Sequence, residues 1–315
     1  MTNSVLQLVN TLIPFFLLWY AAYWSLSVSF WLTLAFAVPA GGFLIRTFII
    51  FHDCCHRSFF RNALANEITG TITGILTCCP YRQWRHTHAV HHATCSNLNR
   101  RGTGDVWTLT VAEYLSSSRL RRAAYRIYRN PIVMFGLGPI YIFLIDYRFN
   151  RKKPGLKERL NTYVTNAGIA AITGLLCWSI GWESFLLVQG PIFMISGMAG
   201  IWLFYVQHQF ENSYYEKDSK WSYVQAAMQG SSYYKLPVAL RWITGNIGFH
   251  HIHHLSPRVP NYYLGAVHDA NPAFRDVTTI TLRTSLQSLR FRYWDENKQK
   301  FVGSREIKAY RASGR

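Results

Sequence analysis

Histidine is the residue type whose spacing in this sequence most directly suggests chemistry. Eleven of the twelve histidines fall in four short segments: "HDCCH" (52–56), "HTHAVHH" (86–92), "QHQFEN" (207–212) and "HHIHH" (250–254). Residues three and four positions apart share one face of a helix. Each of the three multi-histidine segments is therefore expected to direct two or three imidazoles toward one point. His86, His251 and His268 fall outside this pattern.

The histidines that fit the pattern are candidate metal ligands: His52, His56, His88, His91, His92, His208, His250, His253 and His254. Imidazole binds zinc, copper, nickel and iron, so the ligand type alone does not select the metal. One tetrahedral zinc takes four ligands, so nine candidates suit two ions. Neither an HExxH motif nor a Glu-x-x-His pair occurs, which argues against a zinc protease and a soluble di-iron bundle. A pH-sensing patch is the alternative, but it would not require repeated helical spacing.

Four apolar segments are long enough to cross a bilayer, which takes about 20 residues. They cover roughly 5–24, 29–51, 160–181 and 184–207. Two further apolar segments, 63–80 and 131–147, are interpreted as interfacial or re-entrant. In the alternative, in which all six segments cross, residues 82–101 would lie on the opposite face from 52–56.

The basic residues indicate how these segments are oriented. Lys and Arg total 33 against 15 Asp and Glu, and the connections at 25–28 and 181–184 contain no basic residue. Basic loops remain on the cytoplasmic side of a membrane, so both hairpin tips are expected to face outward. Residues 52–159 and 208–315 are then cytoplasmic, and all four histidine segments meet the membrane from that side. Arg46, within the second span, is expected to extend toward the interface.

These observations predict an all-α, polytopic membrane protein that forms a single domain over residues 1–315. Four transmembrane helices would carry a cytoplasmic helical cap, and the cap would hold a two-metal histidine site. The apolar composition, 50% hydrophobic residues, favours a membrane rather than nucleic acid as the partner of the basic surface. The six cysteines form no CxxC motif and are expected to be free thiols.

The histidine segments resemble those of the membrane-bound acyl-lipid fatty acid desaturases, whose three boxes read HxxxH, HxxHH and HxxHH. The resemblance covers nearly the whole chain and includes "FHDCCHRSFF", "HHATCSNLNRRGTGDVWTLTV", "WLFYVQHQFENSYY", "GSSYYKLP" and "NIGFHHIHHLSPRVPNY". The sequence is most similar to the bacterial acyl-lipid Δ5 desaturases. A Δ12-type desaturase and a histidine-box hydroxylase, ketolase or alkane monooxygenase are the enzymatic alternatives. A metal transporter or sensor is the non-enzymatic one.

The resemblance implies two non-haem iron ions that activate O2 and remove two hydrogens from an acyl chain, leaving a cis double bond. It implies that the nine histidines are the ligands, and that an asparagine, here Asn246, holds a metal-bound water. Asp53, Asp105 and Glu211 are candidate acceptors for the ligand N–H groups, because ligating imidazoles usually donate their second N–H to such a partner.

The resemblance further implies that the substrates are acyl chains of phospholipids in the cell membrane. The chain contains no haem-binding "HPGG", no iron–sulphur cysteine spacing and no GxGxxG turn. The electrons must therefore come from a separate donor such as ferredoxin or flavodoxin. The basic surface is expected to bind either that acidic donor or anionic headgroups.

Overall fold

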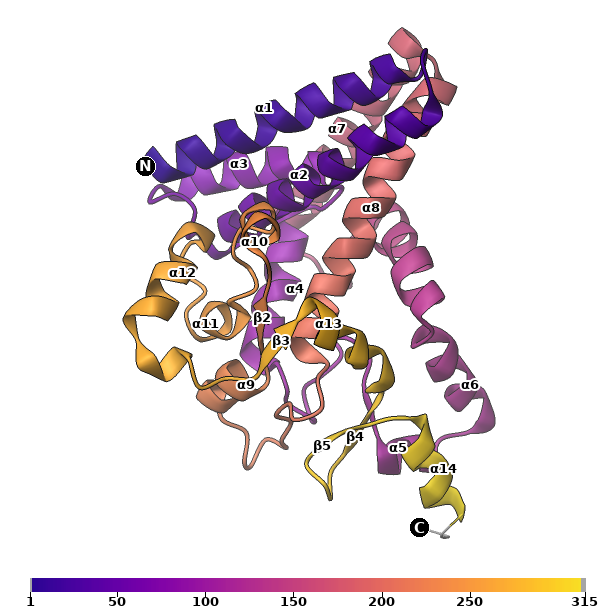
Figure 1. Ribbon diagram of the computed structural model, residues 1–315, viewed down its shortest axis with the longest axis vertical. Coiled ribbons are helices and arrows are strands. Elements are labelled where there is room, and N and C mark those ends of the chain that lie inside the picture. The colour runs from indigo at the N-terminus through magenta and orange to yellow at the C-terminus, as the bar shows by residue number, and fades with distance from the viewer. Residues whose placement is uncertain (1, 313–315) are drawn as a thin grey trace.

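The computed structural model describes residues 2–312, and four long helices dominate the molecule (Figure 1). They are α1 (Thr2–Ser25), α2 (Phe30–His56), α7 (Leu156–Ile180) and α8 (Trp182–His208). Each has 24 to 27 residues and is apolar enough to cross a membrane. A helix of 24 residues is about 36 Å long, which exceeds the roughly 30 Å of a hydrocarbon core. The predicted four-span, mainly α-helical architecture is confirmed.

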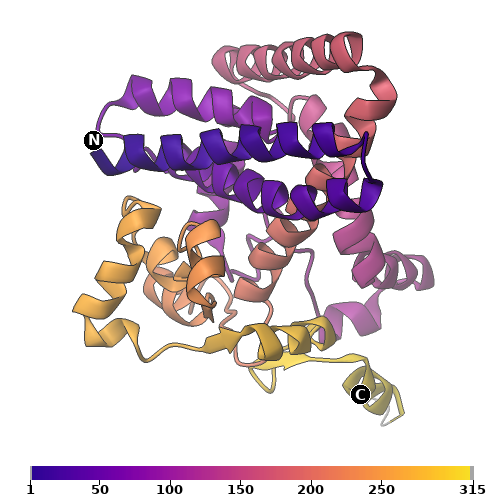
Figure 2. The same ribbon diagram turned by 45° about the horizontal axis from the view of Figure 1, so that its top comes forward.

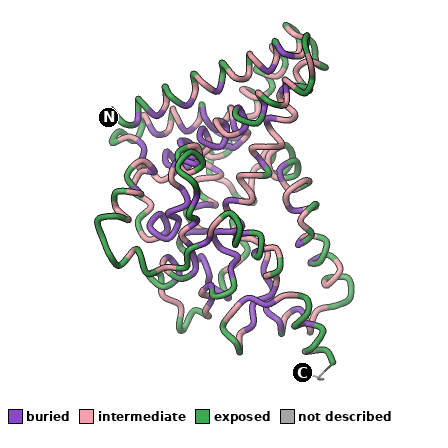
Figure 3. The backbone as a smooth tube through the Cα atoms, in the orientation of Figure 1, coloured by how far each residue is buried: buried purple, intermediate pink, exposed green. Residues whose placement is uncertain are grey.

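Helices α1 and α2 form an antiparallel hairpin whose interface is built from small residues. Ala22, Ala37 and Ala40 are completely buried between the helices, so the two backbones can approach closely. The opposite faces of the long helices carry exposed apolar side chains, such as Leu17 and Trp178, which is 84% exposed. Figure 3 shows the same division, with buried residues concentrated below the long helices. Such outward apolar faces are suited to contact lipid rather than water.

The side chain of Arg46 lies buried between the first hairpin and the cap, and its extension toward the interface stays a prediction. The side chain is only 6% exposed. Its Nε donates to Thr11 Oγ1 over 3.1 Å, a second guanidinium nitrogen donates to the Trp242 carbonyl, and its Cζ lies 3.9 Å from the centre of the Trp242 ring. A charge buried at membrane depth needs such partners. Arg46 thus joins the first hairpin to α10 (Val238–Ile243) of the cap.

The two shorter apolar segments form different structures. Helix α3 (Ala63–Leu76) has 14 residues, fewer than a span needs, and packs against α2. Residues 131–147 fall in two π-helical turns, η1 (Ile132–Leu137) and η2 (Ile140–Ile145), followed by the 3-10 turn η3 (Asp146–Arg148). Together with α6 (Arg119–Tyr128), bent by 64°, they form a fifth candidate span. The interfacial position of both segments therefore stays a prediction.

The remaining elements form the cap around the ends of α2 and α8 (Figures 1 and 2). Besides α10, its helices are α4 (Tyr81–Thr94), α5 (Val111–Ser116), α9 (Tyr223–Gln229), α11 (His250–Leu255), α12 (Asn261–Ala270), α13 (Leu282–Ser285) and α14 (Ser304–Ala312), with 3-10 turns η4 (Pro272–Phe274) and η5 (Leu286–Arg290). Five short strands also occur that were not expected from the sequence: β1 (Leu109–Thr110), β2 (Tyr233–Lys235), β3 (Thr279–Thr281), β4 (Tyr293–Asp295) and β5 (Lys300–Val302). Strands of two or three residues are too short to show alternation in a sequence.

The strands brace the parts of the cap that carry histidines. Strand β1 pairs in parallel with β4, β4 pairs antiparallel with β5, and β2 pairs in parallel with β3. Strand β2 also supports the start of α11, because Tyr234 N donates to Gly248 O over 2.8 Å and the Tyr233 and Phe249 rings stack at 4.7 Å. A Cβ on Gly248 would lie 2.3 Å from Tyr234 O, so only glycine permits this approach.

Candidate metal centre

Four helices bring the nine candidate histidines together below the membrane-spanning layer. Helix α2 supplies its last turn, α8 supplies its final residue, and the short helices α4 and α11 supply the rest. The start of α4 is tied to α2, because Tyr81 Oη donates to the Cys54 carbonyl over 2.9 Å. Eight of the imidazoles are 9% exposed or less, and His56 is partly buried. Segments up to about 200 residues apart in the sequence thus converge, as the sequence analysis expected.

The first cluster consists of five imidazoles: His52, His56, His88, His92 and His253. His88 Nε2 lies 3.1 Å from His52 Nε2 and 3.0 Å from His92 Nε2, and His92 Nε2 lies 3.0 Å from His253 Nε2. His56 Nε2 is buried without a hydrogen-bond partner among the described residues. The Trp84 ring stacks on the His88 ring with 4.1 Å between centres and closes one side of the cluster.

The second cluster consists of four imidazoles: His91, His208, His250 and His254. His250 Nε2 lies 3.0 Å from His208 Nε2 and 3.2 Å from His254 Nε2. His91 Nε2 is buried and has no hydrogen-bond partner in the described part of the chain. Phe204, one turn before His208 on α8, packs its ring 5.2 Å from the His91 ring and 5.1 Å from the His208 ring. The rings of His92 and His254 stack at 4.3 Å, so the two clusters are immediate neighbours.

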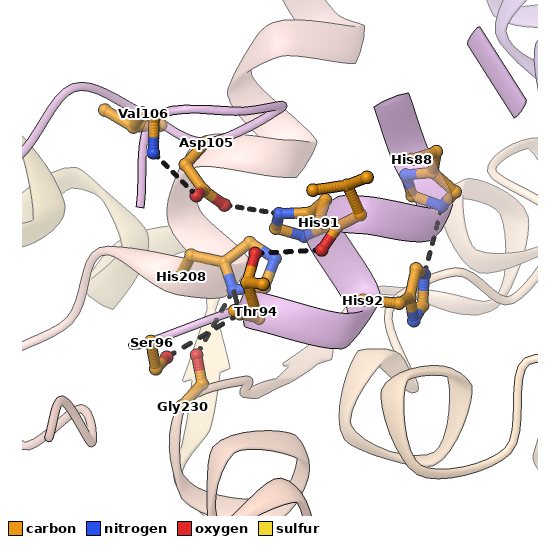
Figure 4. A network of polar contacts seen from close by, with 12 residues as sticks. His88, His91, His92, Thr94, Ser96, Asp105, Val106, His208 and Gly230 are labelled. Atoms are coloured by element: carbon orange, nitrogen blue, oxygen red, sulfur yellow. Dashed lines mark hydrogen bonds and ion pairs between the residues drawn. The ribbon is translucent and has the colours of Figure 1, made fainter. Parts of the chain in front are cut away.

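Each of the last two histidine boxes is divided between the clusters, which corrects the expectation that each box converges on one point. In α4, His88 and His92 face the first cluster and His91 faces the second (Figure 4). In α11, His253 faces the first cluster, whereas His250 and His254 face the second. The i, i+4 pair lies on one side of each helix, and the third histidine is rotated by about 100° or more from one member of that pair. The helix spacing therefore separates ligands as well as grouping them.

The arrangement of the nitrogens fits two transition-metal ions. Two nitrogens each about 2.1 Å from one ion and at right angles would be about 3.0 Å apart. The observed Nε2–Nε2 separations of 3.0 to 3.2 Å match that value in both clusters. Two of these buried nitrogens, on His56 and His91, have no other partner, although buried polar atoms are normally satisfied. An all-imidazole donor set suits iron, zinc, copper or nickel.

Burial keeps these imidazoles in the neutral form that binds metal. It lowers the pKa of each of five ligands in the cap well below 6.5, and the neighbouring imidazoles lower it further: His88, His92, His250, His253 and His254. The unfolded chain would bind protons at these rings near pH 6.5, whereas the folded chain would not. Stability of the metal-free protein is therefore fully present above about pH 6.5 and is lost as the pH falls below it.

Two of the predicted acceptors lie behind ligand imidazoles, one for each cluster. Asp53 Oδ1 lies 3.1 Å from His52 Nδ1. Asp105 Oδ1 lies 2.5 Å from His91 Nδ1 (Figure 4). A carboxylate at Nδ1 fixes the proton there and leaves Nε2 free to bind metal. His208 is held in the same way by a backbone group, because its Nδ1 lies 3.2 Å from Gly230 O.

Asp53 is itself held by a buried polar chain that sequence reasoning missed. Its Oδ2 accepts from the backbone N and the Nδ2 of Asn261, over 2.7 and 2.8 Å. The Asn261 Oδ1 in turn accepts from Gln7 Nε2 over 2.9 Å. Both amides are 3% exposed or less. This series of hydrogen bonds runs from α1 through α12 to Asp53 on α2, next to the ligand. No spacing in the sequence marks either amide as a partner of Asp53.

The expectation for Glu211 is corrected, whereas the expectation that Asn246 holds a metal-bound water stays a prediction. Glu211 lies at the surface, where its Oε1 accepts from Lys300 Nζ over 2.8 Å rather than from a ligand imidazole. Its position three residues beyond the end of α8 directs it outward. Asn246 Nδ2 donates to the Asn261 carbonyl over 3.0 Å, and its backbone takes a left-handed conformation with φ of 56°. Asn246 therefore lies in a turn before α11 rather than on that helix.

Cys95 lies close enough to the second cluster to be considered as a ligand. Its Sγ is within 4.8 Å of nitrogens on His91, His208 and His254. However, it faces the Nδ1 side of His208, at 3.7 Å, whereas His208 Nε2 points to the cluster. Burial, followed by the charge of Asp105, raises the pKa of the Cys95 thiol, which disfavours the thiolate that binds metal. Cys95 is therefore a packing residue behind His208.

Replacing Cys95 with alanine is expected to leave both ions bound and to lower the free energy of unfolding by about 1 kcal/mol, the cost of a small buried truncation. Cys79→Ala is the matched control, because Cys79 is equally buried but lies outside both clusters. Metal content per chain, measured by inductively coupled plasma mass spectrometry, distinguishes the roles. Loss of one ion in the Cys95 variant alone would show that the thiol is a ligand.

A polytopic helical protein with two adjacent histidine clusters at one face of its membrane-spanning layer has the architecture of a histidine-box membrane oxidoreductase. Comparison with known proteins agrees, because the sequence profile "Fatty acid desaturase" matches residues 29–283. A fatty acid desaturase of Bacillus subtilis (strain 168) is 62% identical over 306 residues, which are 97% of this chain and 87% of that protein. The chain belongs to the fatty acid desaturase family and is an oxidoreductase.

The names of more distant relatives specify a type of desaturase. The chloroplastic omega-6 fatty acid desaturase of Arabidopsis thaliana is 28% identical over 237 residues, 71% of this chain. The chain spans about half the length of this plant relative, 49%. The sn-1 oleoyl-lipid 12-desaturase of Anabaena variabilis is 26% identical over 251 residues, covering 77% of this chain and 69% of that protein.

Proposed function

We propose that this chain is an acyl-lipid desaturase that uses two iron ions, O2 and electrons from a separate carrier to form a cis double bond, at Δ5, in the acyl chains of membrane phospholipids. The observation that carries the proposal is the pair of adjacent all-histidine clusters at the membrane face of a four-span chain. We assign five histidines to one ion and four to the other: His52, His56, His88, His92 and His253; and His91, His208, His250 and His254.

In this reaction the protein would hold the ligand imidazoles in position and exclude water from the metal centre. Iron and O2, when bound, supply the oxidant that an unactivated C–H bond requires. Asp53 and Asp105 hold the Nδ1 protons of His52 and His91, so that the Nε2 atoms stay available. Trp84 and Phe204 cover two sides of the clusters with apolar rings. An acyl chain already lies in the bilayer, so a centre on this boundary can receive it without transfer through water.

The predicted membrane placement and electron donor belong to the same proposal. Residues 52–159 and 208–315, which include the histidine segments, contain 32 of the 33 basic residues, and this supports a cytoplasmic position in the cell membrane under the positive-inside rule. A reducing compartment also suits the six free cysteines, two of which, Cys54 and Cys55, adjoin the first histidine box. An acidic carrier such as ferredoxin or flavodoxin fits the basic cap electrostatically.

Two observations bear on the position of the double bond. The similarity of the sequence to bacterial acyl-lipid Δ5 desaturases supports Δ5. The relatives named omega-6 and 12-desaturases support a Δ12-type position as the second candidate. Regiochemistry depends on how far the acyl chain extends past the metals, a property that the ligand set alone does not determine. A histidine-box hydroxylase would use similar ligands but would leave oxygen in the product.

Expression in a host without polyunsaturated or Δ5-unsaturated lipids tests the proposal. We expect phospholipid acyl chains that have lost two hydrogens, with the new double bond located at Δ5 by derivatisation and mass spectrometry. A double bond at Δ12 would support the second candidate. Gain of one oxygen atom would show a hydroxylase, and metal uptake without any altered lipid would contradict both.

A further inference from the structure

A pocket separate from the histidine clusters lies at the membrane edge of the cap. It has a volume of about 360 Å³, within the range of roughly 300 to 1,000 Å³ that is typical of small-molecule sites. Its walls come from the start of α1, the connection after α2 and the connection between α11 and α12. The start of α1 and α12 lie near each other in both ribbon views (Figures 1 and 2).

Three arginines line this pocket: Arg57, Arg61 and Arg258. All three are exposed, none forms an ion pair or side-chain hydrogen bond with a described residue, and no acidic residue is among the lining side chains. Unpaired basic residues occur elsewhere in this basic chain, but here they share one concavity. By contrast, the smaller hollow beside α4 contains Glu158, and its Arg82 is paired with Glu67.

Hydroxyl groups that are held by hydrogen bonds also line the pocket. Ser4 Oγ donates to the Phe59 carbonyl over 2.6 Å and lies 3.2 Å from Tyr262 Oη. The neighbouring hydroxyl, Tyr263 Oη, accepts from Asn3 Nδ2 over 3.3 Å. The Tyr263 O–H therefore remains free to donate to a ligand. A pocket with three guanidinium groups and a spare hydroxyl donor is suited to an oxyanion such as phosphate, which arginine binds through paired N–H groups.

The position of the pocket indicates where such a phosphate would come from. The pocket lies at the ends of α1 and α2 that share a membrane face with the first cluster, directly after His56. Exposed apolar side chains lie close in the sequence to its lining residues Ser4 and Arg61, namely Leu6 on α1 and Leu64 on α3. A phospholipid phosphate occupies this depth, between the acyl region and water, where basic side chains attract anionic lipids.

We infer that this pocket binds the headgroup of an anionic phospholipid, with Arg57, Arg61 and Arg258 around the phosphate and Tyr263 as a further donor. The site is distinct from the metal centre and does not depend on the position of desaturation. Binding would anchor the connections that follow the first and third histidine boxes to the membrane surface. A lipid with a net negative headgroup is favoured over a zwitterionic one, because three positive charges line the pocket without a compensating acid.

Binding of short-chain lipids to purified, delipidated protein in detergent tests this inference. We expect short-chain phosphatidylglycerol to bind the triple variant Arg57→Gln, Arg61→Gln, Arg258→Gln at least about tenfold more weakly than the wild type, because each basic residue contributes to anionic lipid binding. The matched control is Arg283→Gln, Arg305→Gln, Lys308→Gln. It also removes three positive charges, from exposed residues of the cap outside this pocket. We expect this control to bind as the wild type does.

Three outcomes would overturn the inference. Equal weakening of phosphatidylglycerol binding in both triple variants would show that binding depends on the net charge of the protein rather than on the pocket. Equal binding of short-chain phosphatidylethanolamine would remove the selectivity for anionic headgroups, and equally tight binding of inorganic phosphate would show that a free anion is the ligand. If the triple variant does not fold, Arg258→Gln and Tyr263→Phe serve the same test singly. Because the readout is binding, failure of desaturation would not affect it.

Discussion

Replacing His253 with alanine is expected to abolish double-bond formation and to release the ion of the first cluster. His253 contacts several other members of that cluster. Its Nε2 lies 3.0 Å from His92 Nε2, and its ring lies 4.4 Å from the His52 ring and 4.8 Å from the His56 ring. Its removal leaves four imidazoles around an ion arranged for five, and it opens a cavity that water can enter. Metal content should fall from two ions per chain to one.

His251 provides a matched control within the same short helix. It lies two positions from His253 and is completely buried, but its ring faces His268 and Phe274, away from both clusters. His251→Ala should therefore keep two ions and detectable product, although its stability will fall. His250→Ala should lose the ion of the second cluster instead. Retention of two ions and full product in the His253 variant would contradict the ligand assignment.

The general design of the protein could be predicted because its signals are strong and local. Four apolar segments of about 20 residues or more specify the spans, since only helices satisfy their own backbone groups in lipid. Histidines at i, i+3 and i+4 specify a shared helix region, and positive loops place these regions on one face. Asp53 follows a ligand directly in the sequence, and Asp105 shares a segment with the second box, so proximity made both plausible acceptors.

The remaining details depend on tertiary contacts for which the sequence contains no periodic signal. Asn261 reaches Asp53 across more than 200 positions, and Gln7 lies on a helix that otherwise indicates only a membrane span. Asn246 shares the i, i+4 spacing with His250, but it lies in a left-handed turn before α11 rather than on that helix. The short strands and the arginine pocket likewise arise only where separate connections meet.

Replacing Asp53 with asparagine is expected to weaken metal binding at the first cluster by about 100-fold, the upper end of the usual range for partners of ligands. Both donors of Asn261 point at Asp53 Oδ2, so the asparagine oxygen must take that position and its NH2 group must face His52 Nδ1. The NH2 group then donates to Nδ1 and moves the imidazole proton to Nε2. A protonated Nε2 has no lone pair with which to bind metal.

Asp105→Asn is the corresponding change for the second cluster. It is expected to weaken metal binding there by a smaller factor, about 10-fold. The bond from Gly102 N to Asp105 Oδ2 is 3.3 Å long, weaker than the two bonds of 2.7 and 2.8 Å that hold Asp53 Oδ2, so the asparagine can turn its oxygen toward His91 at a smaller cost. Chelator competition on protein loaded with two ions would resolve the two affinities. Each variant should weaken metal binding at one cluster and leave metal binding at the other cluster unchanged. Equal weakening of binding at both clusters in either variant would mean that the clusters bind their ions as one unit, because the stacked rings of His92 and His254 transmit the change.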